Sequence, residues 1–244
     1  MVTNEVRHAE NRLRTKIDWL DSKHSFSFGS SYQPGNTHHG LLLVNNDDVV
    51  APGSGFETHP HRDMEIVTWV LDGSLVHQDS EGHNGVIYPG LAQRMSVGTG
   101  ILHSEKNDVV GTQRPVHFVQ MWVLPDERGI APGYEQLDVS DDLAGGRLVP
   151  VASGLAKHRD DSAIRINQRD AGLYVARLTD GQSVTLPAAP YVHLFLAHGA
   201  ADLEDAGVLT AGDAVRITGS DGQRITAVGP AEILVWEMHS AAAG

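Results

Sequence analysis

The chain has 244 residues, with 18 basic and 31 acidic side chains, no cysteine and 14 histidines. The length suits one large domain or two smaller ones, each able to bury a core. A net charge of −13 argues against a nucleic-acid partner and against an anionic membrane surface, because both need a basic face. The absence of cysteine excludes disulfides, zinc fingers, iron–sulfur clusters and thiol nucleophiles.

The N-terminal segment MVTNEVRHAENRLRTK is polar and lacks the apolar region of a secretory signal. Apolar runs elsewhere fall far short of the ~20 residues that span a bilayer. We therefore expect a cytoplasmic protein with no membrane partner. Little of the chain has helical periodicity, although residues 5–21 are compatible with a short amphipathic piece.

Short apolar runs rich in β-branched and aromatic residues follow one another along the chain, with glycines between them. Many short strands separated by turn signals are typical of an all-β sandwich or barrel. The clearest predicted strands are Ile66–Leu71, Gly85–Tyr88, Val116–Leu124, Tyr191–Ala197, Ala214–Thr218 and Ile233–Met238.

A weak internal repeat divides the chain into two similar halves. The segment Gly90–Ser96 aligns with Gly212–Thr218, and Trp69–Gly73 aligns with Phe195–Gly199. Proline and glycine cluster between residues 125 and 146, which predicts a linker. We expect two β-barrel (jelly-roll-like) domains packed together, residues 1–135 and 136–244.

Ten of the histidines lie in residues 1–122, and the densest cluster is His59-Pro60-His61, followed by His103-Ser104-Glu105. Alternate residues of a strand point to the same face, so His59 and His61 share a face of one strand, and His103 and Glu105 share a face of another. If the two strands are neighbours with these faces inward, three imidazoles and one carboxylate converge. This donor set suits iron(II), manganese, nickel, copper, zinc or cobalt, and it leaves two octahedral positions open.

The spacing of these residues resembles the two cupin motifs. Gly53, His59-x-His61 and Glu65 match the first motif, although Gly73 falls one residue late. The string Gly100-Ile101-Leu102-His103, followed by Asn107, matches the second, with Gly98 where proline is usual.

Longer strings are similar to the pirin family of bicupins: WLDSKHSFSFGSSY, HPHRDMEIVTWVLDGSLVHQDSEG, MSVGTGILHSEKN and VQMWVLP. The resemblance covers residues 10–135 closely and the rest loosely. It implies two facing barrels with a metal, usually iron(II), held by His59, His61, His103 and Glu105. It also implies quercetin 2,3-dioxygenase activity, in which Glu105 takes a proton from a flavonol, O2 opens the ring and carbon monoxide is released.

The carboxylate ligand has an alternative. In ordinary cupins it is the glutamate of the first motif, here Glu65. An even number of positions separates Glu65 from His59 and His61, so on a continuous strand all three side chains would share one face. The pirin pattern favours Glu105, so we predict Glu105 as the ligand and Glu65 as a supporting group.

The second barrel is predicted to bind no metal. The repeat places Thr185, Pro187, Ile225 and Ala227 at the positions of the four ligands, and none of them forms a plausible ligand set. Among the other histidines, we interpret His193 and His198 as structural or surface residues, and His38-His39 as part of a surface loop. His77 and His83 flank a turn, and His117 is a packed or rim residue.

Three functions remain open at this point. The first is the flavonol dioxygenase, acting on a flavonol-like aromatic substrate and O2. The second is a non-catalytic, redox-sensing partner of regulatory proteins, a role that some pirins resemble. The third is a storage or sugar-isomerase-like bicupin. Each is compatible with a monomer or a weak oligomer.

Overall fold

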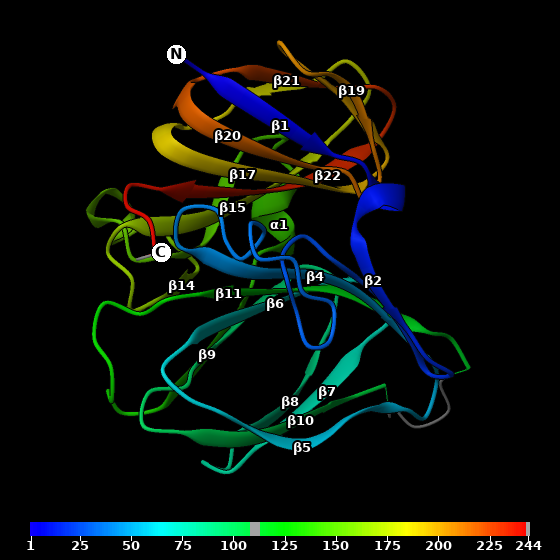
Figure 1. Cartoon of the computed structure of the whole chain (residues 1–244), viewed down its shortest axis with the longest axis vertical. Helices are drawn as coiled ribbons and strands as arrows, with labels where there is room; N and C mark the ends of the chain where they lie inside the picture. Colours follow the sequence, from blue (N-terminus) through cyan, green and yellow to red (C-terminus); the bar gives the residue numbers. More distant parts are fainter. Residues whose placement is uncertain (108–112, 243–244) are drawn as a thin grey trace.

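Strands dominate the computed structural model, which describes residues 1–107 and 113–242. Within these residues the strands form two seven-stranded and two four-stranded sheets. Each of the two domains contains one sheet of each size, and Figure 1 shows the two domains stacked on each other. The predicted all-β class, a bicupin of two packed β-barrel domains, is confirmed.

The N-terminal domain consists of one sheet of each size. Its seven-stranded sheet has the order β12-β9-β6-β11-β4-β3-β2, with bounds Gly133–Asp138, Leu91–Ser96, Glu65–Asp72, Val116–Val123, Leu42–Val50, Leu20–His24 and Leu13–Lys16. Its four-stranded sheet has the order β5-β10-β7-β8, with bounds Gly55–His61, Ile101–Lys106, Leu75–Asp79 and Asn84–Ile87.

The C-terminal domain has the same construction. Its seven-stranded sheet has the order β1-β20-β17-β22-β15-β13-β14, with bounds Thr3–Arg7, Ala214–Asp221, Ala188–His198, Ala231–Met238, Ala171–Leu178, Val149–Ser153 and Ile164–Arg165. Its four-stranded sheet has the order β16-β21-β18-β19, with bounds Ser183–Thr185, Arg224–Ala227, Ala200–Leu203 and Gly207–Thr210. Each predicted strand coincides with a strand of one of these sheets.

The strand orders confirm the internal repeat. Gly90 precedes β9 and Gly212 precedes β20, and these strands occupy the same place in their sheets. The second pair of aligned segments lies on β6 and β17, which also correspond. Similar sequences at similar places in two sheets indicate two copies of one barrel plan.

Strand pairing crosses the predicted domain boundary at both ends of the first domain. β1 pairs with β20 of the C-terminal sheet, so the first strand of the chain belongs to the second barrel. β12 runs past residue 135 and pairs with β9, and the predicted linker therefore contains an edge strand as well as the short helix α1 (Ser140–Leu143).

The amphipathic piece considered for residues 5–21 is not a regular helix. These residues form parts of β1, β2 and β3 with one short 3-10 turn, η1 (Ala9–Asn11). A second such turn, η2, spans Ala156–His158. Pairing with two different sheets overrides the weak helical pattern. Among the described residues, no helix is long and apolar enough to cross a bilayer.

The two seven-stranded sheets pack face to face through an apolar layer. Val67, Trp69 and Met121 contribute from the N-terminal sheet, and Phe195 and Trp236 contribute from the C-terminal sheet, all of them buried. Alternation along each strand sends one face into this layer and the other into its own barrel. The layer therefore joins the two domains into one core.

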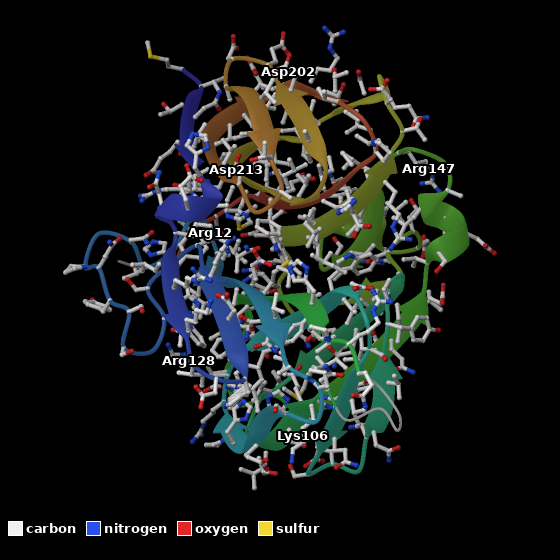
Figure 2. All side chains as sticks on the ribbon, turned by 90° about the vertical axis from the view of Figure 1, so that its right-hand side faces the viewer. Arg12, Lys106, Arg128, Arg147, Asp202 and Asp213 are labelled. Carbon is white, nitrogen blue, oxygen red and sulfur yellow. The ribbon has the colours of Figure 1, made fainter. Side chains whose placement is uncertain are left out.

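A buried arginine crosses the junction of the domains. Arg12 donates through Nη1 to Asp47 Oδ2 at 3.3 Å and to the Gly212 carbonyl at 3.1 Å. Its Nη2 donates to the carbonyls of Lys23 and Asn45 at 2.9 and 3.1 Å. Figure 2 shows Arg12 between the two halves, near Asp213. Arg12 thus satisfies backbone carbonyls at the point where the chain passes from β1 to the other sheet.

The interiors of the two barrels differ. Val192, Leu194, Ile217 and Ile225 belong to one continuous apolar cluster inside the C-terminal barrel. In the N-terminal barrel the apolar residues form two separate clusters, one around Phe118 and another around Ile66 and Met95. Buried polar side chains occupy the remaining interior, and they form the candidate site.

We predict that Trp236→Ala lowers the free energy of unfolding by about 3–5 kcal/mol, because it leaves a large cavity in the layer between the sheets. Chemical denaturation followed by far-ultraviolet circular dichroism measures this. Val208→Ala is the control, because Val208 is 59% exposed and its truncation should cost less than about 0.5 kcal/mol. A loss below about 1 kcal/mol for Trp236→Ala contradicts the assigned role of the layer.

Candidate metal centre

The predicted ligands lie on two paired strands. In the antiparallel pair of β5 and β10, His103 is opposite His59, and Ile101 is opposite His61. The register shifts between His103 and Glu105, where a bulge alters the pairing. β5 is the edge strand of its sheet, which explains how Pro60 is tolerated between the two histidines.

The three predicted histidines converge. Their ring centroids are 4.7 Å apart for His59 and His61, 4.5 Å for His59 and His103, and 4.9 Å for His61 and His103. One ring nitrogen from each lies within 4.8 Å of the others, which is the spacing of a potential metal site. The spacing argument therefore placed these side chains correctly.

The hydrogen bonds of these imidazoles fit a bound cation. His59 Nδ1 lies 2.7 Å from the Glu57 carbonyl, so it carries the proton and leaves Nε2 with its lone pair. This Nε2 lies 3.1 Å from Nε2 of His103. The buried Nε2 of His61 has no hydrogen-bond partner among the described residues. Ring nitrogens that lie close together and have available lone pairs suit a metal ion.

The environment keeps two of the imidazoles neutral. The pKa of His61 is lowered to about 4, mainly by burial and also by the neighbouring His103 and His59. Burial, followed by His59 and His77, lowers the pKa of His103 to about 3. Since neutral imidazole is the form that binds metal, these nitrogens are available near neutral pH.

Glu105 lies buried on β10 and lines the same cavity as His59 and His61. Its Oε2 accepts a hydrogen bond from Gln120 Nε2 at 2.7 Å, and its Oε1 accepts one from Thr68 Oγ1 at 3.4 Å. Gln120 is itself fixed by Trp122, whose Nε1 donates to Gln120 Oε1 at 3.0 Å. The carboxylate is therefore held in place beside the histidines.

Glu65, the alternative carboxylate, faces the other way. Its Oε2 accepts from Ser96 Oγ at 2.9 Å and from the backbone N–H of Asn167 at 3.0 Å, and its Oε1 accepts from Asn167 Nδ2 at 3.2 Å. The alternation of side chains along β5 does not continue to Glu65, because the chain turns at Asp63, which has a φ of 50°. Glu65 therefore connects β6 to the C-terminal domain.

His77 is the buried histidine that sequence reasoning undervalued. One of its ring nitrogens lies within 4.8 Å of ligand atoms of His103 and Glu105. Its Nε2 is 3.2 Å from Asp79 Oδ2, and the same Asp79 oxygen is 3.1 Å from His83 Nδ1. The pattern HQD on β7, which is paired with β10, was the available signal.

His59, His61 and Glu105 line a cavity of about 320 Å³ between the two sheets of the N-terminal barrel. Phe28, Phe56 and Trp122 provide aromatic walls. The volume lies at the lower end of the range for small-molecule sites.

A polar wall completes the cavity. It consists of Thr15, Ser22, His24, Asn46 and Asp48, which come from β2, β3 and β4 of the seven-stranded sheet. Strand alternation in a polar stretch such as NNDD gave no sign that two of these residues face inward. These residues were therefore missed.

The other histidines serve mainly as structural contacts. His39 is a correction to the predicted surface loop, because it is buried against Tyr191 and its Nε2 is 3.2 Å from the Ile217 carbonyl. His193 is fully buried and His198 is exposed on the same strand. His117 is partly exposed, with Nε2 2.6 Å from Asp47 Oδ1.

Two cupin barrels with a histidine cluster inside one of them define a bicupin. The model of the family named Pirin matches residues 6–123, and that of the quercetinase C-terminal cupin domain matches residues 151–238. The chain belongs to the pirin family.

Individual relatives extend this result over the whole chain. A Mycobacterium tuberculosis protein named "Putative quercetin 2,3-dioxygenase" is 57% identical over 238 residues, 98% of this chain and 96% of the relative. The quercetin 2,3-dioxygenase of Escherichia coli K12 is 44% identical over 185 residues, 75% of this chain and 76% of the relative.

Solved structures agree with the fold. YhhW from Escherichia coli superposes with a TM-score of 0.88 at 34% identity, covering 99% of this chain and 100% of that one. A second structure of YhhW, in complex with nickel(II), gives a TM-score of 0.86 at 34% identity, with 98% and 100% coverage.

We predict that Asp48→Asn raises the melting temperature of the metal-free protein at pH 8 by several degrees. For a chain of this size, each kcal/mol gained in the free energy of unfolding raises the melting temperature by about 2–4 °C. The pKa of Asp48 is raised to about 7, mainly by burial and also by the charges of Asp47 and Glu105, while Ser22 and Arg12 oppose part of the rise. A raised carboxyl pKa favours the folded state at low pH, and this contribution is lost as the pH rises through about 7.

Thermal melts at pH 5 and pH 8 check this prediction. The difference in melting temperature between the variant and the wild type should be largest at pH 8 and smaller at pH 5, where wild-type Asp48 is protonated. An equal difference at both values would show that Asp48 is not an acid of raised pKa.

Proposed function

We propose that this protein is a metal-dependent dioxygenase of the quercetin 2,3-dioxygenase type. In this proposal His59, His61, His103 and Glu105 hold one divalent metal, which we expect to be iron(II). Manganese, nickel, copper, zinc and cobalt are the alternatives that the same donors accept. The substrates are a flavonol-like aromatic molecule and O2.

One observation carries the proposal: the histidine cluster opens into a cavity with aromatic walls. The edges of Phe28 and His61 each contact Trp122, with centroids 5.6 and 4.8 Å away. A flat aromatic ligand would pack against such walls while its oxygen atoms approach the metal. The cavity therefore favours a small-molecule substrate over a role in which metal only tunes a protein-binding face.

Glu105 is the catalytic residue of the proposal. Its carboxylate takes the proton of the flavonol 3-hydroxyl, so that the substrate binds as its anion. Gln120 and Thr68 donate to its two oxygens and hold both in position for this transfer. A bound metal supplies a Lewis-acidic, redox-active centre that brings the flavonol anion and O2 together.

In the overall reaction both atoms of O2 enter the ring-opened ester, and carbon 3 of the flavonol leaves as carbon monoxide. The aromatic residues around the site exclude water during this change. The protein's own part is thus to bind and orient the substrate and to hold the proton at Glu105.

The metal-binding part is tested by elemental analysis and by titration calorimetry of the metal-free protein. We expect about one metal ion per chain, and at least ~100-fold weaker binding in His103→Ala, which loses a ligand. His198→Ala, on the exposed end of β17, is the control and should bind as the wild type does. Unchanged metal content in His103→Ala contradicts the ligand assignment.

Turnover is tested with metal-loaded protein, quercetin and O2, by oxygen uptake, loss of flavonol absorbance and detection of carbon monoxide. We expect Glu105→Gln to lower kcat by about 10²–10⁴-fold, the usual contribution of a general base. Glu65→Gln should retain kcat, because its carboxylate binds Ser96 and Asn167. The proposal fails if none of the six metals supports turnover, and the assignment of Glu105 fails if only Glu65→Gln is inactive.

A further inference from the structure

The wall of the cavity opposite the histidines carries one acceptor without a partner. His59, His61 and Glu105 come from the four-stranded sheet, whereas Asp48 lines the cavity from β4 of the facing sheet. Asp48 is 3% exposed, and its Oδ1 has no hydrogen-bond partner within the described part of the chain. A buried carboxyl oxygen without a donor is costly, so it requires an explanation.

The neighbours of Asp48 are already engaged with one another. His24 Nδ1 lies 2.8 Å from Asn46 Oδ1, and His24 Nε2 lies 2.9 Å from Thr15 Oγ1. Ser22 hydrogen-bonds the Asp48 carboxyl but leaves Oδ1 free. The polar wall is therefore a fixed frame in which Asp48 Oδ1 is available to a ligand.

Nearby charges do not neutralise this carboxyl. The positive charge of Arg12 lowers the pKa of Asp48, but the guanidinium donates to Asp47 and to backbone carbonyls. Burial raises the pKa of Asp48 to about 7, and the hydrogen bond from Ser22 opposes only part of this rise. A hydroxyl group of a ligand would supply the missing donor.

We propose that Asp48 recognises a hydroxyl group of the substrate that is remote from the pair of oxygens directed at the metal. The proposal rests on the flavonol-type function above and narrows its substrate class to polyhydroxylated aromatic molecules. Asp48 is then a specificity residue: it accepts a hydrogen bond from the substrate and takes no part in bond making or breaking. A site built to bind a hydroxyl discriminates strongly against an analogue that lacks it.

Two probes separate this role from metal binding. 3-Hydroxyflavone retains the 3-hydroxyl and the adjacent carbonyl but lacks the further hydroxyls of quercetin. Binding of both to the metal-loaded protein is measured by calorimetry without O2, so the result does not depend on turnover. We expect wild-type protein to bind quercetin about 10- to 100-fold more tightly than 3-hydroxyflavone, as for a hydrogen bond to a charged group.

Variants of Asp48 supply the decisive comparison. Asp48→Ala should remove most of the preference for quercetin while leaving the affinity for 3-hydroxyflavone within about threefold, and Asp48→Asn should retain part of the preference because its amide oxygen still accepts. Ser30→Ala, at an exposed position on the cavity rim, is the matched control and should keep the full preference. Thermal melts confirm that each variant is folded.

The outcomes distinguish this inference from the proposed function. A preference for quercetin that persists in Asp48→Ala overturns the role of Asp48, even if the protein is an active dioxygenase. Equal wild-type affinity for the two probes, or binding of neither, also overturns it. Selective binding that depends on Asp48 supports the inference, whether or not flavonol turnover is found.

Discussion

The apolar layer between the two seven-stranded sheets is the contact on which the candidate site depends. A barrel interior that also accommodates histidine, glutamine and acidic side chains has its apolar residues divided into separate clusters, which limits the apolar surface that can stabilise it. The N-terminal sheet compensates through its other face, where Trp69 and Met121 pack against Trp236 of the neighbouring domain. One sheet thus supplies both the packing that holds the fold and the polar wall that lines the cavity.

Burial sets the chemistry inside that cavity. Desolvation keeps His61 and His103 neutral and raises the pKa of Asp48. Burial of each of these groups lowers the stability of the fold, but it leaves the imidazoles in the neutral form that binds metal. Glu105 accepts hydrogen bonds from Gln120 and Thr68 through its two oxygens, whereas Asp48 Oδ1 has no donor among the described residues. Two carboxyls in one cavity therefore have distinct environments, which suits one for contact with a cation and the other for contact with a neutral hydroxyl.

Sequence reasoning was most accurate where a local pattern determines the structure. Strand alternation and the spacing of His59, His61 and His103 predicted the cluster. In two paired strands, residues opposite each other point to the same face of the sheet, so the sequence positions are enough to bring these side chains together. It was least accurate where the decisive contact lies far away in the chain. The assignment of β1 to the other barrel, the burial of His39 and the turn that separates Glu65 from the histidines all depend on such contacts. Asp48 was missed and His77 was given little weight because the residues next to them, NNDD on β4 and HQD on β7, are polar on both faces of the strand.

The corresponding strands of the two barrels place different side chains in the two interiors. β21 pairs with β16 and β18 as β10 pairs with β5 and β7, but Ile225 and Ala227 on β21 are buried and apolar. The same arrangement of strands is therefore compatible with either a continuous apolar core or a polar cavity. The inward-facing residues of a few strands determine which of the two forms. Because the C-terminal barrel has its own apolar core and shares the layer between the sheets, the N-terminal barrel can carry costly buried groups. The uneven distribution of histidine between the halves follows from this division between stability and chemistry.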